Sequence, residues 1–183
     1  MLTAEQIREL LQMRPHPIEG GYFAETYRSP QMVPENLLPG YPGDRAISTA
    51  IYYLLTPETF SAMHRVRGDE MFHFYLGDAV EMLELKPDGS GEVILLGQDL
   101  AAGMLLQHNV PGGVWQGSRL RQGGKYALLG TTMAPGFEYG DYETGQPQEL
   151  IARYPVYSQV ITSLTRKDAI AGAKEPKRRY CDA

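Results

Sequence analysis

Between residues 21 and 134 the chain is a series of short runs rich in Val, Ile, Tyr, Phe and Leu, separated by clusters of Gly, Pro and Asp. Runs of this kind are typical of β-strands joined by turns. The predicted strands are residues 21–27, 48–55, 61–66, 70–76, 80–85, 93–96, 105–110, 114–117 and 126–133. A chain with so many short strands is expected to fold as an all-β, double-sheet jelly roll.

The two ends of the chain and one internal segment depart from this pattern. Thr3 and Gln6 have the spacing of a capping box, and apolar residues at helical spacing follow, so a short helix is predicted as far as Met13. A second helix is predicted over residues 156–164, packed on the outside of the sandwich. Residues 29–44 contain several prolines and form a long loop, which a compact domain retains as a lid or an interface element.

At 183 residues the chain is near the size of one domain, and no linker or internal repeat divides it. We predict a single domain over residues 1–166 and a polar, basic C-terminal tail over residues 167–183. The basic residues of this tail are interpreted as solvated rather than functional; they are Lys174, Lys177, Arg178 and Arg179.

The charge pattern and the N-terminus narrow the choice of partners and compartment. The net charge is -5 and no internal basic stripe is present, which argues against a nucleic-acid partner. The first residues lack the basic start and apolar run of a signal peptide, and no stretch is long enough to span a membrane, so we expect no membrane partner and a cytoplasmic location. Cys181 is the single cysteine, which excludes an internal disulfide and a cysteine-rich zinc site.

His64 and Glu70 are polar residues on two neighbouring predicted strands, joined by a turn at residues 67–69. Because alternate side chains of a strand share a face, each of them falls on the same face as apolar residues two positions away. If those faces line the inside of the sandwich, His64 and Glu70 point inward as neighbours, and Gln116 is a third inward polar group. Buried polar groups need partners or a ligand, so a satisfied core pair is the alternative to a binding pocket.

The same residues have the spacing of known motifs. His64, Glu70 and Gly77 resemble the first cupin motif, in which a Glu follows the His and a Gly follows the Glu after six further residues. Residues 111–116, with the sequence PGGVWQ, resemble the second cupin motif, with Gln116 in place of its usual His. Ala62 stands where the first of two closely spaced histidines is expected.

Residues 15–143 resemble more specifically the cupin family described as a domain of unknown function (Cupin_5, DUF985). The resemblance runs through residues 15–28, 48–55, 64–70 and 134–137, in the same order. It implies the double-stranded β-helix of the cupin jelly roll with short N- and C-terminal helices, and a homodimer. It implies no established reaction; members have been compared with metal-free sugar epimerases of the same fold, which is a likeness of shape.

This resemblance favours a pocket for a small-molecule ligand over a satisfied core pair. We assign His64 and Glu70 as candidate catalytic residues. Candidate substrate-binding residues are polar or aromatic side chains near the expected pocket: Gln116, Tyr22, Glu25, Arg28, Tyr52, Trp115 and Phe137. The alternatives are an exposed Glu25–Arg28 ion pair and aromatic residues that belong to the core.

The remaining histidines are not assigned to the pocket. His73 is out of phase with Glu70 and is expected to face away from it, unless a bulge re-aims the strand. His16 and His108 stand near turns or strand ends and are expected to be surface or capping residues.

A cupin metal is held by imidazoles and a carboxylate, and this chain retains one of each at the matching positions. The neutral side chain of Gln116 is a weak ligand, so we expect no tightly bound transition metal. The sequence does not identify a cofactor. The alternative, in which a metal binds despite Gln116, remains open.

Three functions remain open from the sequence. One is a metal-independent, epimerase-like or isomerase-like enzyme acting on a sugar derivative or similar polar metabolite, with His64 as general base or acid and Glu70 orienting it. The second is a non-catalytic small-ligand-binding cupin. The third is a metal-dependent cupin isomerase or oxygenase.

Overall fold

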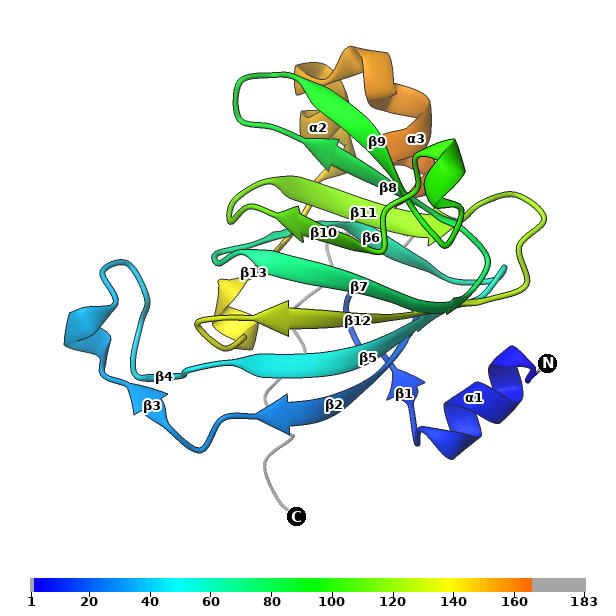
Figure 1. The fold of residues 1–183 in the computed structure, drawn as a ribbon. Coiled ribbons are helices and arrows are strands. Elements are labelled where there is room, and N and C mark those ends of the chain that lie inside the picture. The colour runs from blue at the N-terminus through cyan, green and yellow to red at the C-terminus, as the bar shows by residue number, and fades with distance from the viewer. Residues whose placement is uncertain (1, 166–183) are drawn as a thin grey trace.

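The computed structural model describes residues 2–165, and its strands form two antiparallel sheets that face each other (Figure 1). The first sheet runs in the order β1 (Arg14–Pro15), β2 (Tyr22–Arg28), β5 (Thr49–Leu55), β12 (Ala127–Met133), β7 (Glu70–Gly77) and β10 (Gln107–Val110). The second sheet runs in the order β13 (Tyr142–Thr144), β6 (Phe60–Val66), β11 (Trp115–Leu120), β8 (Val80–Leu85) and β9 (Gly91–Leu96). The predicted all-β double-sheet architecture is confirmed.

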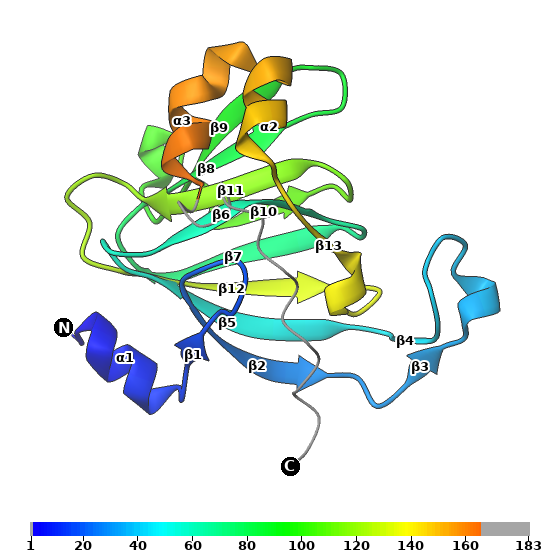
Figure 2. The ribbon, with the colours of Figure 1, turned by 180° about the vertical axis from the view of Figure 1, so that it is seen from behind.

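Short helices cover the outer faces of both sheets (Figure 2). The helix α1 (Ala4–Leu10) begins at the predicted Thr3–Gln6 capping box and packs on the first sheet through Ile7. The helices α2 (Pro147–Arg153) and α3 (Ser158–Ser163) pack on the second sheet, together with the 3₁₀ turn η4 (Pro155–Tyr157). The sequence predicted the last of these helices and missed α2, whose start is marked by Pro147 at its first turn.

The proline-rich segment predicted as a loop contains structure of its own. Its strand β3 (Met32–Val33) pairs with β4 (Arg45–Ala46), and the 3₁₀ turn η1 (Glu35–Leu37) lies between them. In Figure 1 this β3–η1–β4 arm projects from the edge of the sandwich. Two further 3₁₀ turns, η2 (Leu100–Ala102) and η3 (Tyr139–Asp141), connect strands elsewhere.

The interior between the sheets has two halves of different character. Its apolar half is a cluster in which Phe74, Leu129 and Met82 meet from three strands. Its polar half consists of residues farther along the same strands, among them Glu70, Thr131 and Glu84, which are buried. We define the polar half by its inward side chains: Glu19, Ser61, His64, Glu70, Glu84, Gln116, Ser118 and Thr131. Ser118 lies at its border, directly opposite Met82 of the apolar half.

Some predictions fall beyond the described part of the chain. The domain boundary at residue 166 is not tested, and the basic tail with Lys174, Lys177, Arg178, Arg179 and Cys181 lies outside the described residues. Within residues 2–165 no helix is long and apolar enough to cross a membrane.

Candidate functional site

His64 is held firmly by its neighbours in the polar half. It lies on β6, is 2% exposed, and its ring stacks on Tyr142 of β13 with the ring centroids 4.8 Å apart. Its Nδ1 atom lies 2.8 Å from the carbonyl oxygen of Ala62. Because a carbonyl oxygen only accepts hydrogen bonds, Nδ1 carries a proton, and Nε2 is the atom that can gain or lose one.

Glu19 is the carboxylate that Nε2 of His64 faces, with 3.9 Å between Nε2 and Oε2. It lies on the segment that joins β1 to β2, and Ser61 of β6 donates a hydrogen bond of 2.6 Å to its Oε1 atom. A backbone bond from Ala62 N–H to the Glu19 carbonyl, 2.9 Å long, ties the same segment to β6. These bonds place a residue from outside the strands against the inner face of the second sheet.

The environment of Glu19 favours its ionised form. Burial alone would raise the pKa of Glu19, but the charges of His64 and His16, with hydrogen bonds from Ser61 and Tyr53, lower the pKa below its usual value. His16 also fixes the backbone there, since its Nδ1 accepts the Glu19 N–H at 2.9 Å. Glu19 is therefore an ionised carboxylate beside Nε2 of His64.

Glu70 has the opposite preference. It begins β7, and Gln116 of β11 donates a hydrogen bond of 2.7 Å from Nε2 to its Oε2 atom. Burial raises the pKa of Glu70, and the charge of Glu19 raises it further, against the effects of His64, Thr131 and Gln116. The polar half thus holds two carboxyl groups whose pKa values are displaced in opposite directions around one imidazole, an arrangement typical of acid–base sites.

Gln116 occupies the centre of a row across the second sheet. On β11 it lies directly opposite His64 of β6 on one side and Glu84 of β8 on the other. Glu84 is buried and forms an ion pair with His108, which reaches it from β10 of the first sheet. The row therefore ends in a second imidazole–carboxylate contact that joins the two sheets.

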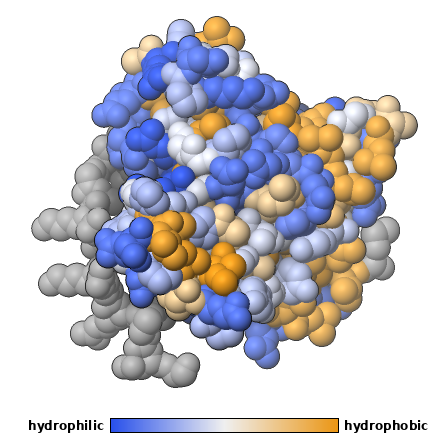
Figure 3. All heavy atoms as spheres, turned by 60° about the vertical axis from the view of Figure 1, so that its left-hand side comes forward, coloured by the Kyte–Doolittle hydropathy of each residue, from blue (hydrophilic) through white to orange (hydrophobic). Residues whose placement is uncertain are grey.

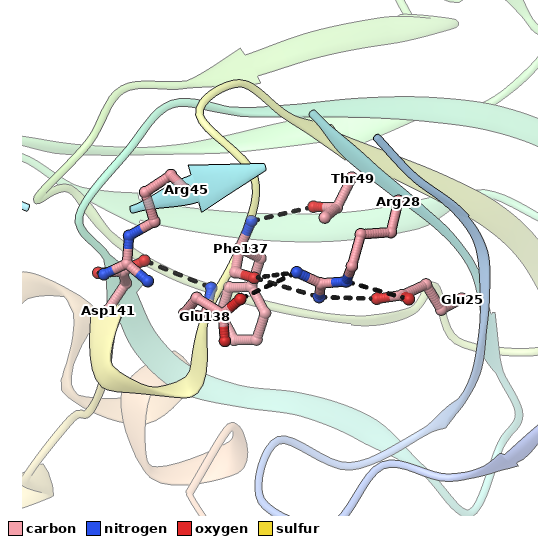
Figure 4. A network of polar contacts seen from close by, with 7 residues as sticks. All are labelled: Glu25, Arg28, Arg45, Thr49, Phe137, Glu138 and Asp141. Atoms are coloured by element: carbon pink, nitrogen blue, oxygen red, sulfur yellow. Dashed lines mark hydrogen bonds and ion pairs between the residues drawn. The ribbon is translucent and has the colours of Figure 1, made fainter. Parts of the chain in front are cut away.

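A network of arginines holds the segment around η3 in place (Figure 4). Arg28 donates to Glu25, to Glu138 and to the carbonyl oxygen of Phe137. The side chain of Thr49 accepts the Phe137 N–H at 3.0 Å.

Farther along the same segment, Arg45 and Asp141 form an ion pair of 3.0 Å, with their side chains only 4% and 1% exposed. Arg67 approaches the same Asp141 oxygen at 3.3 Å. The ring centroids of Phe137 and Tyr139 in this segment lie 5.4 Å apart. The ring centroid of Tyr139 lies 6.5 Å from that of His16.

The structure brings His64, Glu70 and Gln116 together and places three predicted ligand-binding residues elsewhere. Tyr22 and Tyr52 belong to the cluster on the outer face of the first sheet beneath α1. Trp115 packs with the helices on the outer face of the second sheet, under the guanidinium of Arg65. These three assignments are corrected, because alternation along β2, β5 and β11 turns their side chains away from the interior.

Glu25, Arg28 and Phe137, which were predicted to bind the ligand, do not belong to the polar half as defined above. They form an exposed ion pair and a backbone anchor that position the η3 segment. The expectation of an exposed Glu25–Arg28 pair agrees with this geometry. Their part in ligand binding stays a prediction.

The other histidines lie as follows. His73 contacts Thr132 and Gln107 and stacks on Tyr75, away from the polar half, as the strand phase predicts. His16 caps the 16–19 turn as expected but is only 8% exposed. The prediction of His108 as a surface or capping residue is wrong, since its side chain is 18% exposed and pairs with buried Glu84.

The donor set does not fit a cupin metal. Within the described residues, no group of three or more His, Cys, Asp or Glu side chains is arranged to hold a metal ion. The amide of Gln116 is turned toward Glu70 as a hydrogen-bond donor, which is the role of a partner to a carboxyl group rather than that of a ligand. We therefore derive no step through a metal.

Two surface concavities are lined by residues outside this cluster. One lies between α1 and residues 56–58, and another between residues 56–60 and 119–124. Neither is lined by a residue of the polar half as defined above.

Comparison with protein-family models matches residues 5–145 to Cupin_5, described as Cupin superfamily (DUF985). The chain belongs to this family. The resemblance inferred from the sequence is confirmed, and so is the cupin jelly roll.

Individual relatives of this cupin agree with that assignment. This cupin is 33% identical over 133 residues to the Uncharacterized protein YML079W of Saccharomyces cerevisiae. The matched region covers 68% of this chain and 66% of the yeast protein, which is just under two thirds of its length. The crystal structure of Protein SO0799 from Shewanella oneidensis is similar with a TM-score of 0.80 and 33% identity, covering 91% of this chain and 99% of that one. A hypothetical protein from Leishmania major is similar with a TM-score of 0.80 and 32% identity, covering 91% and 100%. None of these names states an activity, so the family establishes the fold and leaves the reaction open.

Sequence reasoning missed several members of this cupin's polar half. Glu19 was read only as part of a family segment, although it provides the carboxylate nearest to His64. Ser61 and Thr131 were read as ordinary strand residues, and Tyr142 lies in a segment read as irregular. The signal available for Glu19 was its place directly before Gly20 and Gly21 within the first family segment.

Proposed function

We propose that the polar half of the interior is a small-molecule site at which His64 and two carboxyl groups transfer protons. The reaction class that this favours is a metal-independent, epimerase-like or isomerase-like conversion of a sugar derivative or similar polar metabolite. The buried cluster itself carries this proposal: Nε2 of His64 faces Glu19 at 3.9 Å, and Glu70 is bonded to Gln116, the residue opposite His64. The opposite directions in which the pKa values of Glu19 and Glu70 are displaced support it. A satisfied structural pair needs no such separation of acid and base roles.

The geometry supports a role for each group. His64 accepts the proton of a carbon–hydrogen bond next to a carbonyl at Nε2, and ionised Glu19 stabilises the resulting imidazolium. Glu70, which retains its proton more readily than an ordinary glutamate, donates that proton to the carbonyl oxygen as the enolate forms. The enol then returns its hydroxyl proton to Glu70 as the carbon is reprotonated. Delivery of a proton to the opposite face of the same carbon gives the epimer, and delivery to the former carbonyl carbon, with removal of the proton of the neighbouring hydroxyl group, gives the isomer.

The test begins with the ligand that the protein retains. Wild-type protein is denatured, the released small molecules are identified by mass spectrometry, and the compound is then incubated with fresh protein in D₂O. We expect NMR to show exchange of one carbon-bound proton, and His64→Gln and Glu19→Gln to slow this exchange by roughly 10²-fold or more. His73→Gln, an imidazole variant on the outer face, is the matched control and should exchange at the wild-type rate.

The outcomes separate the proposed enzyme from its alternatives. A retained compound that never exchanges a proton would identify a non-catalytic ligand-binding cupin. Exchange that persists in both His64→Gln and Glu19→Gln would overturn the assignment of the site.

We also propose that this cupin is a homodimer, formed with a second copy of the chain through the β3–η1–β4 arm. Met32, Leu37 and Ile47 of this arm and its flank are exposed large apolar residues. Figure 3 shows hydrophobic residues gathered on the side of the molecule from which the arm projects. Exposed apolar patches of this kind mark protein contacts.

Light scattering at micromolar concentration tests this. We expect twice the mass of the chain for the wild type, and the mass of a single chain for the Met32→Asp, Leu37→Asp double variant. A wild type that runs as a single chain would refute the dimer.

A further inference from the structure

Two buried polar atoms on β11 have no hydrogen-bond partner among residues 2–165: Oε1 of Gln116 and Oγ of Ser118. Both residues are 1% exposed, and they stand two positions apart on the same strand. Oε1 of Gln116 is an amide oxygen and can only accept a hydrogen bond, while Nε2 of the same amide already donates to Glu70. A buried acceptor without a donor lowers the stability of the fold by about 1–3 kcal/mol. A ligand with hydrogen-bonding groups next to β11 would satisfy these two atoms.

The charges around these atoms are unsuited to an anion. The polar half contains the carboxyl groups of Glu19, Glu70 and Glu84. Glu19 faces His64, and Glu84 is already paired with His108. A buried anion needs a cationic partner. The two imidazoles of this cluster, His64 and His108, already lie beside carboxylates of the protein.

The arginines discussed above also form ion pairs with carboxylates of the protein. Arg45 and Arg67 both contact Asp141. Arg28 is held by Glu25 and Glu138. Arg65 points to the outer face of the second sheet, where it lies over Trp115 and bonds to Glu143 through two nitrogens. A phosphate or carboxylate group entering the polar half would therefore have to break an existing ion pair to be neutralised.

Aromatic rings complete the surroundings. Tyr142 stacks on His64, and Phe23 lies edge-on to His16 with the centroids 4.8 Å apart. Aromatic faces beside a few fixed polar groups suit a molecule that has both hydroxyl groups and apolar carbon–hydrogen faces.

We propose that the ligand of this site is an uncharged polyhydroxylated carbonyl compound, a free aldose or ketose, rather than its phosphate, nucleotide or acid form. Its hydroxyl groups donate to Gln116 Oε1 and pair with Ser118 Oγ. Strand geometry sets residues two apart at roughly 7 Å, so the ligand uses hydroxyls on opposite sides of a six-membered ring or on successive units. This inference rests on the proposed small-molecule site and specifies what enters it.

Matched pairs of probes test the charge requirement. Neutral hexoses, both aldoses and ketoses, are compared with the corresponding hexose phosphates and uronates by ligand-observed NMR and calorimetry. We expect at least one neutral member to bind, and its anionic counterpart to bind roughly tenfold more weakly or worse.

Variants locate the binding within the molecule. Ser118→Ala removes one unpaired atom, and Gln116→Leu removes the unpaired Oε1 together with the hydrogen bond from Nε2 to Glu70. Each variant should weaken binding of the neutral probe by roughly tenfold. His73→Ala on the outer face is the control and should bind as the wild type does. Thermal unfolding of each variant confirms that it is folded.

The possible results distinguish the two proposals. If anionic probes bind as well as neutral ones and Gln116→Leu weakens both, the site stands and the ligand class is wrong. If neutral probes bind but neither β11 variant weakens them, the hydrogen bonds to β11 are wrong. If no probe of either charge binds and the purified protein retains no small molecule, the proposed site itself fails.

Discussion

The apolar and polar halves of the sandwich interior are built by the same strands but have different tasks. Along β7 the inward residues change from Glu70 to Phe74, and along β12 from Thr131 to Leu129. The apolar half joins the two sheets by burying large side chains, which stabilises the fold by about 1.5–3 kcal/mol for each one. The polar half buries carboxyl groups and unpaired atoms that weaken the fold, a pattern that stability does not explain and that the proposed site accounts for.

One contact at the border of the polar half is expected to matter most for stability. Replacing Asp141 with Ala leaves the buried guanidinium of Arg45 without its partner, and we expect a loss of about 3–5 kcal/mol in the free energy of unfolding. The matched control is Glu143→Ala, which breaks the exposed pair with Arg65 and should cost less than about 1 kcal/mol. Denaturant titration measures both; equal losses would show that burial of the pair does not matter.

A pair of substitutions on β12 compares the two halves directly. Leu129→Ala opens a cavity in the apolar half and should cost about 2–5 kcal/mol. Thr131→Ala, two residues along the same strand, removes only a hydrogen bond to Glu70 and should cost about 0.5–1.5 kcal/mol. If urea denaturation gives equal losses for the two variants, the division of the interior into halves is wrong.

The two carboxyl groups should give opposite pH dependences. Because the pKa of Glu70 is raised in the folded state, its contribution to stability is fully present below the unfolded pKa of about 4.3 and is lost as pH rises through the folded pKa. Because the pKa of Glu19 is lowered, its contribution is present above about 4.3 and is lost as pH falls through the folded pKa.

Stability is measured against pH for the wild type, Glu70→Gln and Glu19→Gln. Relative to Glu70→Gln, the wild type should lose stability on going from acidic to neutral pH. Relative to Glu19→Gln, it should lose stability on going to acidic pH. Two differences that run in the same direction would contradict the opposed acid and base roles.

The strands were predictable because their local pattern is strong. The prediction for residues 80–85 matches β8, and that for residues 70–76 matches β7 to within one residue. The boundaries follow from turn residues next to β-branched and aromatic runs, which are local features.

The side of each strand that faces inward was harder to predict. On β5, Tyr53 points into the interior while its neighbour Tyr52 packs on the outer face. Both faces of β5 are covered by other parts of the protein, so the polarity of its residues does not show which face is the inner one. The sequence therefore placed Tyr52 near the pocket, whereas its side chain packs on the outer face. Tyr22 and Trp115 were misassigned for the same reason.

Glu19 was beyond prediction for a different reason. It reaches His64 only because the segment before β2 bonds to Ser61 and Ala62, more than 40 residues away in the chain. No local pattern encodes such a contact. The expected absence of a tightly bound metal stays a prediction that elemental analysis can check, and the cytoplasmic location also stays a prediction.

The most direct measurement on the central claim is a denaturant titration of wild type and His64→Ala, with each sample also assayed for the small molecule it retains. If the polar half is a binding site, His64→Ala should lose the retained compound while the protein stays folded, with a loss of about 1–3 kcal/mol in the free energy of unfolding because His64 is a buried, hydrogen-bonded group. If His64 is only a structural core residue, the compound is retained although stability falls. Full retention of the compound together with a loss of about 1–3 kcal/mol or more would contradict the site.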